Sequence, residues 1–549
     1  MIIGVGVFLF SVLAFAVMGI CRKKWKQSQD DNQDVIAHRN VGFFLSTLSL
    51  STTLAGGLFI NRTTALVYEE GLAHTLPPWT YASSLIIGAF IFVKNIRKEE
   101  YITMVDPLQE QYGSIMGACL SIPALFSDIL WCAALLSFFA SVACSMVECN
   151  YSYVVVACLA VVTFYTLTGG LYGVLYTHIL YIFFILTALW LVVPFALIHP
   201  HVDLISSMNL NWSGVIRITD IGRWSDQALL LIFGGIPRQV YFQHVLSSKS
   251  PQYARIVSFG AAVSVVIISL PPVIIGMTGK STNWLSVLPE NSTLVTGTGA
   301  IINTEQVFTM VMKYLTPYWV SIIALGGHCA ATLSSADSAL LSTSSILSHN
   351  VYKTLIRRKA SSTEVSWVYR ACVLFSALLS GTLACFVTSL TDLWIFSYDL
   401  VYVILFPQFL GATLLNLGNI YGSIVALITA LVLRLSGGDE RIGLPITVEY
   451  PYFDKVQLFP FRTFAMIMSF LALIIVSSLA DWWRPARKST IPPEDVSVLK
   501  LSYKEPSYVT PSHSFAHIDH RSQNCSADTS EEAKILKTED SGFGMVSSN

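Results

Sequence analysis

The chain has 549 residues, of which 53% are hydrophobic and only 12% are charged, and its mean hydropathy is +0.60. Soluble globular proteins carry about 25% charged residues, so this composition excludes a fully solvated surface. The net charge of −1 argues against nucleic acid as a partner. Ten cysteines without C-x-x-C spacing argue against a zinc site or a disulfide framework. We therefore expect an all-α integral membrane protein.

Apolar stretches long enough to cross a membrane recur along the chain. A bilayer core of about 30 Å needs about 20 apolar residues per helical span, and thirteen stretches meet this requirement. They lie approximately at residues 2–20, 41–67, 79–96, 116–146, 152–170, 174–198, 227–247, 256–278, 317–347, 366–389, 393–411, 417–435 and 461–481. The first has no basic segment before it and no small-residue cleavage site, so we expect a retained span rather than a signal peptide.

Basic residues predict the orientation of these spans. Lys and Arg are concentrated in the loops on one side, beginning with the loop after the first span. Because basic loops stay in the cytosol, we expect an extracellular N-terminus and a cytosolic tail at 482–549. Three glycosylation sequons, at Asn150, Asn211 and Asn291, fall in the predicted outer loops, as glycan acceptors require.

The tail is rich in Ser, Lys, Glu, Asp and Pro and has few large apolar residues, a composition typical of disorder. Within it, Glu531 to Leu536 approximates an acidic di-leucine sorting signal, with Ile535 and Leu536 as the apolar pair for an endocytic adaptor. An ordinary polar tail with one apolar pair explains the same residues equally well.

Helix-weakening residues interrupt two of the spans. The second contains Leu54-Ala-Gly-Gly57, and the seventh contains Gly234-Gly-Ile-Pro237. These spans are five apart, so they begin two blocks of five helices with opposite orientation. Paired interruptions of this kind indicate an inverted-repeat transporter whose site lies at the breaks, although glycines can also serve close helix packing. The chain then divides into a first helix and loop (1–40), two repeat halves (41–198 and 199–411), two additional helices (412–481) and the tail (482–549).

Charged groups inside apolar spans are costly and usually functional. Here they are Arg62, Asp128, Arg238, Asp337 and Asp399. The ninth span is also rich in hydroxyl groups between residues 334 and 345. Hydroxyl and carbonyl oxygens suit a hard monovalent cation, whereas serine-mediated helix packing is the alternative.

Two tryptophans stand near intramembrane acids. Trp131 follows Asp128 by three residues, and Trp394 precedes Asp399 by five. Aromatic faces bind a quaternary ammonium through cation–π attraction of about 2 kcal/mol per desolvated ring. Core packing explains each tryptophan equally well.

Seven sequence strings, in the expected order between about 40 and 480, resemble the sodium:solute symporters and, within them, the high-affinity choline transporters. They are Tyr101–Pro107, Thr166–Tyr172, Phe233–Pro237, Val240–Gln243, Val245–Ser248, Leu333–Ser338 and Asp399–Gln408. The resemblance implies a LeuT-like five-plus-five inverted repeat in the plasma membrane, or in synaptic or vesicle membranes. It also implies sodium-driven choline uptake that supplies acetylcholine synthesis, with chloride as a further candidate ion.

The resemblance implies functional residues by position. Sodium would bind to the backbone carbonyls of Thr52 and Ala55 together with Ala331, Ser334 and Ser335, and Asp337 would be a second cation ligand beside it. The cage for the substrate would draw on Tyr81, Trp131 and Trp394.

The chain also departs from the family pattern around the predicted site. Leu54 and Arg238 stand where choline transporters have tryptophan, and the permanent charge of Arg238 would repel a trimethylammonium in a low-dielectric cavity. The remaining departures are Arg62 for Gly, Ala65 for an acid, His178 for Asp, Tyr181 for Gln and His244 for Arg. If an acid pairs with Arg238, the site stays open to a cation; an unpaired Arg238 indicates an anionic group.

We therefore expect a symporter that imports choline or a related small organic solute. A zwitterionic or anionic substrate is the alternative, because Arg matches carboxylate geometry. A non-transporting sensor or regulatory homologue is a second alternative, against which the retained Ser334, Ser335 and Asp337 argue. No catalytic arrangement with the right context is present, so an enzyme is not expected.

Overall fold

The structure is a computed structural model, and it describes residues 39, 41–147, 149–203, 212–288, 294–296, 300–386, 390–438, 445–452 and 457–483. Several predicted features lie outside these residues: the span at 2–20, the sequons at Asn211 and Asn291, and the sorting signal at Ile535 and Leu536.

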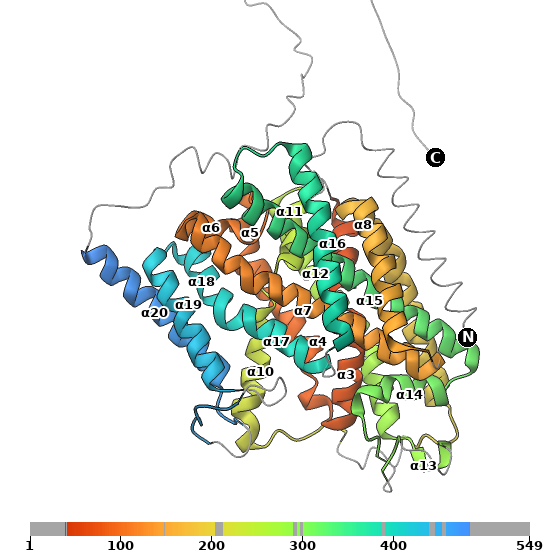
Figure 1. Cartoon of the computed structure of the whole chain (residues 1–549). Coiled ribbons are helices and arrows are strands. Elements are labelled where there is room, and N and C mark those ends of the chain that lie inside the picture. Colours follow the sequence, from red (N-terminus) through yellow and green to blue (C-terminus); the bar gives the residue numbers. More distant parts are fainter. Residues whose placement is uncertain are drawn as a thin grey trace, which may run out of the picture. The chain divides into compact units, whose positions relative to one another are not determined.

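The described part of the chain is helical, and its only β-structure is three isolated bridges. Figure 1 shows the helices in their arrangement. The first half contains α2 (Phe43–Leu54), α3 (Gly57–Glu69), α4 (Leu76–Ile91), α5 (Val93–Lys98), α6 (Asp106–Tyr112), α7 (Ser114–Val147) and α8 (Tyr151–Leu197). The second contains α10 (Ile221–Gly234), α11 (Gln239–Ser247), α12 (Pro251–Lys280), α13 (Trp284–Val287), α14 (Val307–Tyr314), α15 (Tyr318–Ser345), η6 (Ile346–Ile356), α16 (Ser362–Phe386), α17 (Leu390–Asp399), η7 (Leu400–Leu405), α18 (Phe406–Leu410) and η8 (Gly411–Leu415). Two further helices follow, α19 (Ile420–Ser436) and α20 (Phe461–Trp483).

The second predicted span is a broken helix. α2 and α3 meet at an angle of 54°, and Ala55 between them has a non-helical backbone (φ −85°, ψ 45°). The next residue, Gly56, approaches α15 so closely that a Cβ atom there would lie 2.3 Å from the Ser335 hydroxyl oxygen. Only glycine permits this approach, so the break and the contact with α15 depend on the same residue.

The seventh predicted span is broken in the same way. α10 ends at Gly234 and α11 begins at Gln239. Pro237 lies between them and has no backbone N–H to continue the helical ladder. A Cβ atom at Gly235 would lie 2.6 Å from the hydroxyl oxygen of Ser84 on α4, so this break is also a close packing point. Both interruptions that the sequence predicts are therefore present.

The fifth and sixth predicted spans are two helices that follow each other without a loop and meet at a kink; together they make up the 47 residues of α8. Gly170 lies within it in a conformation that only glycine adopts readily (φ 56°, ψ −165°), and it kinks the helix. The boundary that we expected between 170 and 174 is therefore a kink rather than a loop.

Seven described helices are long and apolar enough to cross a membrane, and the bent pair α2–α3 makes an eighth. The predicted number of thirteen spans is not confirmed. The stretch 2–20 lies outside the described residues, and α8 joins two predicted spans. α4 and α19 have only 16 and 17 residues, and α10 and α11 are separate short helices.

The most buried spans lie where the two breaks meet. The most apolar 18-residue stretch of α7 and that of the α15–η6 span are each 83% buried inside the protein, whereas the corresponding stretch of α20 is only 22% buried. α15 packs against α8, α7 and α2. An apolar helix that keeps most of its surface exposed belongs next to lipid, so α20 is peripheral and α15 is central. The functional groups described below are carried mainly by the central helices.

Candidate functional site

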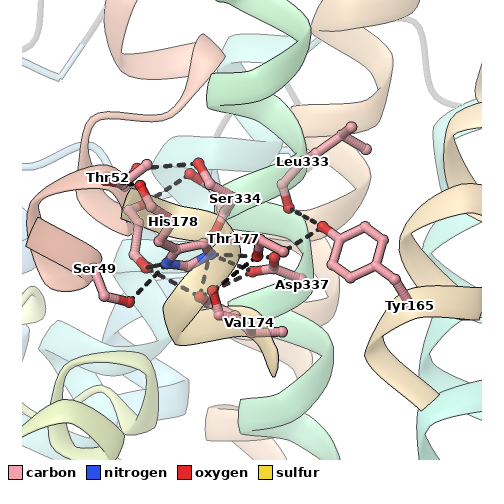
Figure 2. A network of polar contacts seen from close by, with 12 residues as sticks. Ser49, Thr52, Tyr165, Val174, Thr177, His178, Leu333, Ser334 and Asp337 are labelled. Carbon is pink, nitrogen blue, oxygen red and sulfur yellow. Dashed lines mark hydrogen bonds and ion pairs between the residues drawn. The ribbon is translucent and has the colours of Figure 1, made fainter. Parts of the chain in front are cut away.

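A cluster of oxygen atoms joins the broken end of α2 to the middle of α15. The Ser334 hydroxyl lies 3.2 Å from the carbonyl oxygen of Thr52 and 2.9 Å from that of Ala331. The Ser335 hydroxyl lies 2.6 Å from the carbonyl oxygen of Thr53 and 3.2 Å from that of Ala331. All five residues are buried, and Figure 2 shows Ser334 beside Thr52.

The cluster exists because α2 stops at Leu54. A helix leaves the carbonyl groups of its last turn without intrahelical partners, and the hydroxyl groups of α15 reach those carbonyls. Carbonyl and hydroxyl oxygens are the ligands that hard cations prefer. Of the sodium ligands that the resemblance implies, the structure brings together Thr52, Ala331, Ser334 and Ser335, and it places Ala55 at the end of the same helix.

The carboxylate of Asp337, one turn along α15, is surrounded by hydrogen-bond donors. The Tyr165 hydroxyl donates to Oδ2 at 2.8 Å, and Nε2 of His178 lies 3.1 Å from each carboxylate oxygen. The Ser338 hydroxyl lies 3.1 Å from Oδ1. Figure 2 shows Tyr165 and His178 on α8 converging on Asp337. A buried charge requires such donors, so the kinked helix α8 supplies the stabilisation of this acid.

His178 also connects α8 to α2. Its Nδ1 lies 2.7 Å from the Ser49 hydroxyl, and its backbone carbonyl lies 3.4 Å from the Thr52 hydroxyl. The ring is completely buried, and the ring of Tyr181 lies 6.1 Å away, centre to centre. His178 and Tyr181, two residues that we expected to depart from the family pattern, thus lie next to the candidate sodium ligands.

The predicted substrate residues line a small cavity between the two helix breaks. It has about 20 Å³ of open space, room for about one water molecule. The lining residues come from the end of α2, from α4 and α7, from the α10–α11 break, from α11 and from α17: Leu54, Tyr81, Ser84, Leu85, Trp131, Gly235, Arg238, Val240, Tyr241 and Tyr398. Four of the five expected substrate residues therefore share one cavity, and Trp394 does not line it.

Arg238 fills this cavity with its own guanidinium group. Its Nη2 lies 3.1 Å from Oδ1 of Asp128, whose other oxygen accepts a hydrogen bond from Ser342. Its central carbon lies 5.0 Å from the ring centre of Trp131 and 4.7 Å from that of Tyr398. Its Nε and Nη1 are buried without a hydrogen-bond partner among the described residues. Arg238 is thus paired with an acid, and it lies against two aromatic faces.

The aromatic wall is held together by two hydroxyl groups. The Tyr398 hydroxyl donates to the Tyr81 hydroxyl at 2.6 Å, and the two rings stack at 5.9 Å. Trp394 packs edge-on against Tyr398, also at 5.9 Å. Our sequence reasoning missed Tyr398, although its position four residues after Trp394 places it on the same helical face.

A larger vestibule of about 620 Å³ lies next to the cavity. α17 connects the two, because Trp394 lines the vestibule and Tyr398, one turn later, lines the cavity. The charged side chains of the vestibule wall are five acids and two arginines: Glu69, Glu70, Asp220, Glu305, Asp392, Arg62 and Arg223. A wall with excess negative charge attracts cations.

Asp399, the last of the intramembrane acids, lies outside both cavities. Arg434 of α19 approaches it to 2.6 Å and Arg462 of α20 to 3.0 Å. This acid therefore anchors the two peripheral helices to the core and does not belong to the site. Neither arginine was among the predicted intramembrane charges.

Comparison with known proteins identifies the fold and the family. Residues 35–428 match the sequence profile of the sodium:solute symporter family. The chain belongs to the sodium:solute symporter family. The matched region contains both broken helices and α15, and with them every residue of the site described above.

Relatives of this symporter are similar over most of their length. The high-affinity choline transporter 1 of Drosophila melanogaster is 39% identical over 487 residues, which cover 87% of this chain and 78% of the relative. The protein of the same name from Caenorhabditis elegans is 38% identical, with 87% and 85% covered. The human protein is 35% identical, with 90% and 87% covered.

Solved structures share the fold of the symporter. A sodium-coupled sialic acid symporter in a substrate-bound outward-open state has a TM-score of 0.72 at 16% identity, covering 86% of this chain and 97% of that one. A nucleobase–cation symport transporter in a closed conformation has a TM-score of 0.54 at 13% identity, covering 85% and 97%. The expected all-α, LeuT-like inverted-repeat fold is confirmed, and the protein is a multi-pass membrane transporter rather than an enzyme.

Proposed function

We propose that this sodium-coupled symporter imports choline or a closely related small organic solute across the plasma membrane. The observation that carries the substrate assignment is the position of Arg238, whose guanidinium lies against Trp131 and Tyr398 and is paired with Asp128. Such a cavity stabilises a cation through aromatic faces and one counter-ion. The relatives named as choline transporters and the acidic vestibule support the same substrate class.

Sodium would bind where α2 is broken. The proposed ligands are the carbonyl groups of Thr52 and Ala55 together with Ala331, Ser334 and Ser335 of α15. Leu54, which lines the substrate cavity, lies between Thr52 and Ala55. A cation at these oxygens holds the end of α2 against α15, and the same helix end forms one wall of the cavity. Sodium and substrate then favour the same conformation, which is the requirement for coupling.

Arg238 has to leave the aromatic faces before choline can use them, because the open space holds only about one water molecule. Replacement of Arg238 by tryptophan removes the competing cation, adds a ring and leaves Asp128 to face the ammonium. We expect the KM for choline to fall at least tenfold, since a desolvated cation–π contact contributes about 2 kcal/mol.

The test is sodium-dependent uptake of radiolabelled choline in cells in which surface expression has been confirmed. A separate measurement with gluconate in place of chloride tests whether uptake requires chloride. Arg370→Trp is the matched control, because Arg370 also lies over a tryptophan ring, that of Trp367, but on the exposed face of α16. Uptake by the wild type that Arg238→Trp leaves unchanged would contradict the role of Arg238. Absence of any sodium-dependent flux would favour the non-transporting homologue.

A zwitterionic substrate is the second candidate, and one observation favours it. Nε and Nη1 of Arg238 are buried donors without a partner among the residues that the structure describes, and a carboxylate accepts from two such donors at once. Betaine tests this candidate, because it carries the same trimethylammonium group as choline and adds a carboxylate. Sodium-dependent betaine uptake that exceeds choline uptake would assign the zwitterion.

The proposed orientation places the N-terminus outside and the tail inside the cell. The vestibule then opens to the extracellular side, because α3 leads outward to Glu69 and Glu70. Asn150 lies exposed at the start of α8, where a glycan is sterically accessible. If this orientation is right, glycosidase treatment lowers the apparent mass of the wild type, and a variant lacking Asn150, Asn211 and Asn291 shows no such change.

The proposed adaptor signal is tested separately. Replacing Ile535 and Leu536 by alanine should abolish internalisation from the cell surface.

A further inference from the structure

The environment of Asp337 differs from that of the oxygen cluster one turn away. Both carboxylate oxygens already face donors: the Tyr165 hydroxyl at 2.8 Å, Nε2 of His178 at 3.1 Å from each oxygen, and the Ser338 hydroxyl at 3.1 Å. A carboxylate has about four acceptor positions, so these three side chains occupy its coordination sphere. Asp337, Tyr165 and His178 are all buried to within 2% of full burial.

His178 cannot contribute to a sodium site in this arrangement. Nε2 lies 3.1 Å from both carboxylate oxygens, so the ring occupies the space beside Asp337 that a cation would need. Imidazole nitrogen is also a poor ligand for hard ions, which bind oxygen. The ring is fixed from its other side by the Ser49 hydroxyl, 2.7 Å from Nδ1 (Figure 2).

The oxygen cluster at the end of α2, unlike the surroundings of Asp337, suits a hard cation. Thr52, Ala331, Ser334 and Ser335 present carbonyl and hydroxyl oxygens without a nitrogen donor at the same point. The hydroxyl groups can rotate their protons away and offer lone pairs to a cation. The two neighbouring positions on α15 are therefore not equivalent, and only the oxygen cluster suits sodium.

We propose that the symporter binds a single sodium ion, at Thr52, Ala55, Ala331, Ser334 and Ser335, and that the side chain of His178 occupies the place of a second cation beside Asp337. The proposal rests on the proposed sodium coupling. It assigns Asp337 a positioning role, in which its carboxylate holds α8 to α15 through His178 and Tyr165. It also predicts that one sodium ion accompanies each substrate molecule.

The test is equilibrium binding of radioactive sodium to the purified full-length protein in lipid nanodiscs, counted per chain. We expect one ion for the wild type, and none for Ser335→Ala. His178→Asp replaces the donor by a second carboxylate and opens space beside Asp337, so this variant should bind two ions. His178→Asn is the matched control, because it has the same shape as aspartate without the charge, and it should bind one.

Each result has a separate meaning. Two ions in the wild type would overturn the single-site proposal and leave sodium coupling intact, whereas no bound ion would contradict the coupling itself. A count of one in folded His178→Asp would show that His178 does not replace a cation. If that variant does not fold, Asp337→Asn decides: one bound ion supports the proposal, and loss of the ion identifies Asp337 as a sodium ligand.

Discussion

At the scale of single residues, the most consequential contact is the ion pair of Arg238 and Asp128. The two side chains are 110 positions apart in sequence and both are almost fully buried. Removing one partner of a buried pair leaves an uncompensated charge, whereas removing both can be nearly neutral. Asp128 neutralises Arg238, and under the proposed function it is also the acid that an incoming ammonium would meet.

Asp128→Asn should lower the unfolding free energy by about 3–5 kcal/mol, because Arg238 then stays charged and buried without a counter-ion. Asp128→Asn combined with Arg238→Gln should recover most of that loss. Thermal unfolding of the detergent-solubilised protein, followed by size-exclusion chromatography with fluorescence detection, measures both. An unfolding temperature of Asp128→Asn equal to that of the wild type would disprove the pairing.

At the scale of secondary-structure elements, the break between α2 and α3 connects the proposed sodium ligands to the proposed substrate cavity. Ser334 and Ser335 contact the carbonyl groups at the end of α2, and Leu54 from the same end lines the cavity. The break is possible because Gly56 has no side chain where it meets α15. Adding one methyl group at Gly56 should therefore affect the binding of both sodium and the substrate.

Gly56→Ala should destabilise the protein by about 1–3 kcal/mol, because the added carbon overlaps the Ser335 hydroxyl. It should also raise the sodium concentration needed for half-maximal uptake, since Ser335 is displaced from its carbonyl partner. Gly173→Ala on α8 is the control, because a Cβ atom there has no neighbour within 4 Å. Equal sodium dependence in the two variants would contradict this account of the break.

At the scale of the whole molecule, two buried acids, Asp399 and Asp226, contribute to attaching the additional helices α19 and α20 to the rest of the helical bundle. Asp399 at the end of α17 pairs with Arg434 and Arg462, and Arg462 also lies 3.5 Å from Asp226 on α10. These contacts join helices from three regions of the chain. Because the group lies outside the substrate cavity, its contribution is to stability.

Asp399→Asn should lower the unfolding free energy by about 3–5 kcal/mol, because Arg434 and Arg462 both lose their ion pair with this buried carboxylate, although Arg462 keeps its contact with Asp226. The KM for choline should not change in the folded fraction. Glu364→Gln is the control, since its partner Arg357 is 62% exposed and such surface pairs contribute about 0–1 kcal/mol. A changed KM with unchanged stability would place Asp399 in the transport site instead.

Much of the fold was predictable because it depends on local patterns. Apolar stretches of the required length correspond to the long helices, and the Gly-Gly and Gly-Gly-Ile-Pro strings coincide with both breaks. The kink at Gly170 was not predicted, because two apolar runs separated by a few small residues look the same whether they are kinked or looped. The predicted number of spans is not confirmed, since length and composition do not distinguish a full span from a short buried helix.

The sequence by itself determined the class of the protein and the two broken helices, because both follow from residues that are neighbours in the chain, and it supplied most members of the candidate site. Only the tertiary structure decided how the charges are paired. Arg238 meets Asp128, and His178 meets Asp337, 159 positions away. Tyr398 joins Tyr81 across 317 positions. Partners at such separations are chosen by helix packing, and in a low-dielectric interior the choice of partner decides whether a charge is available to a substrate.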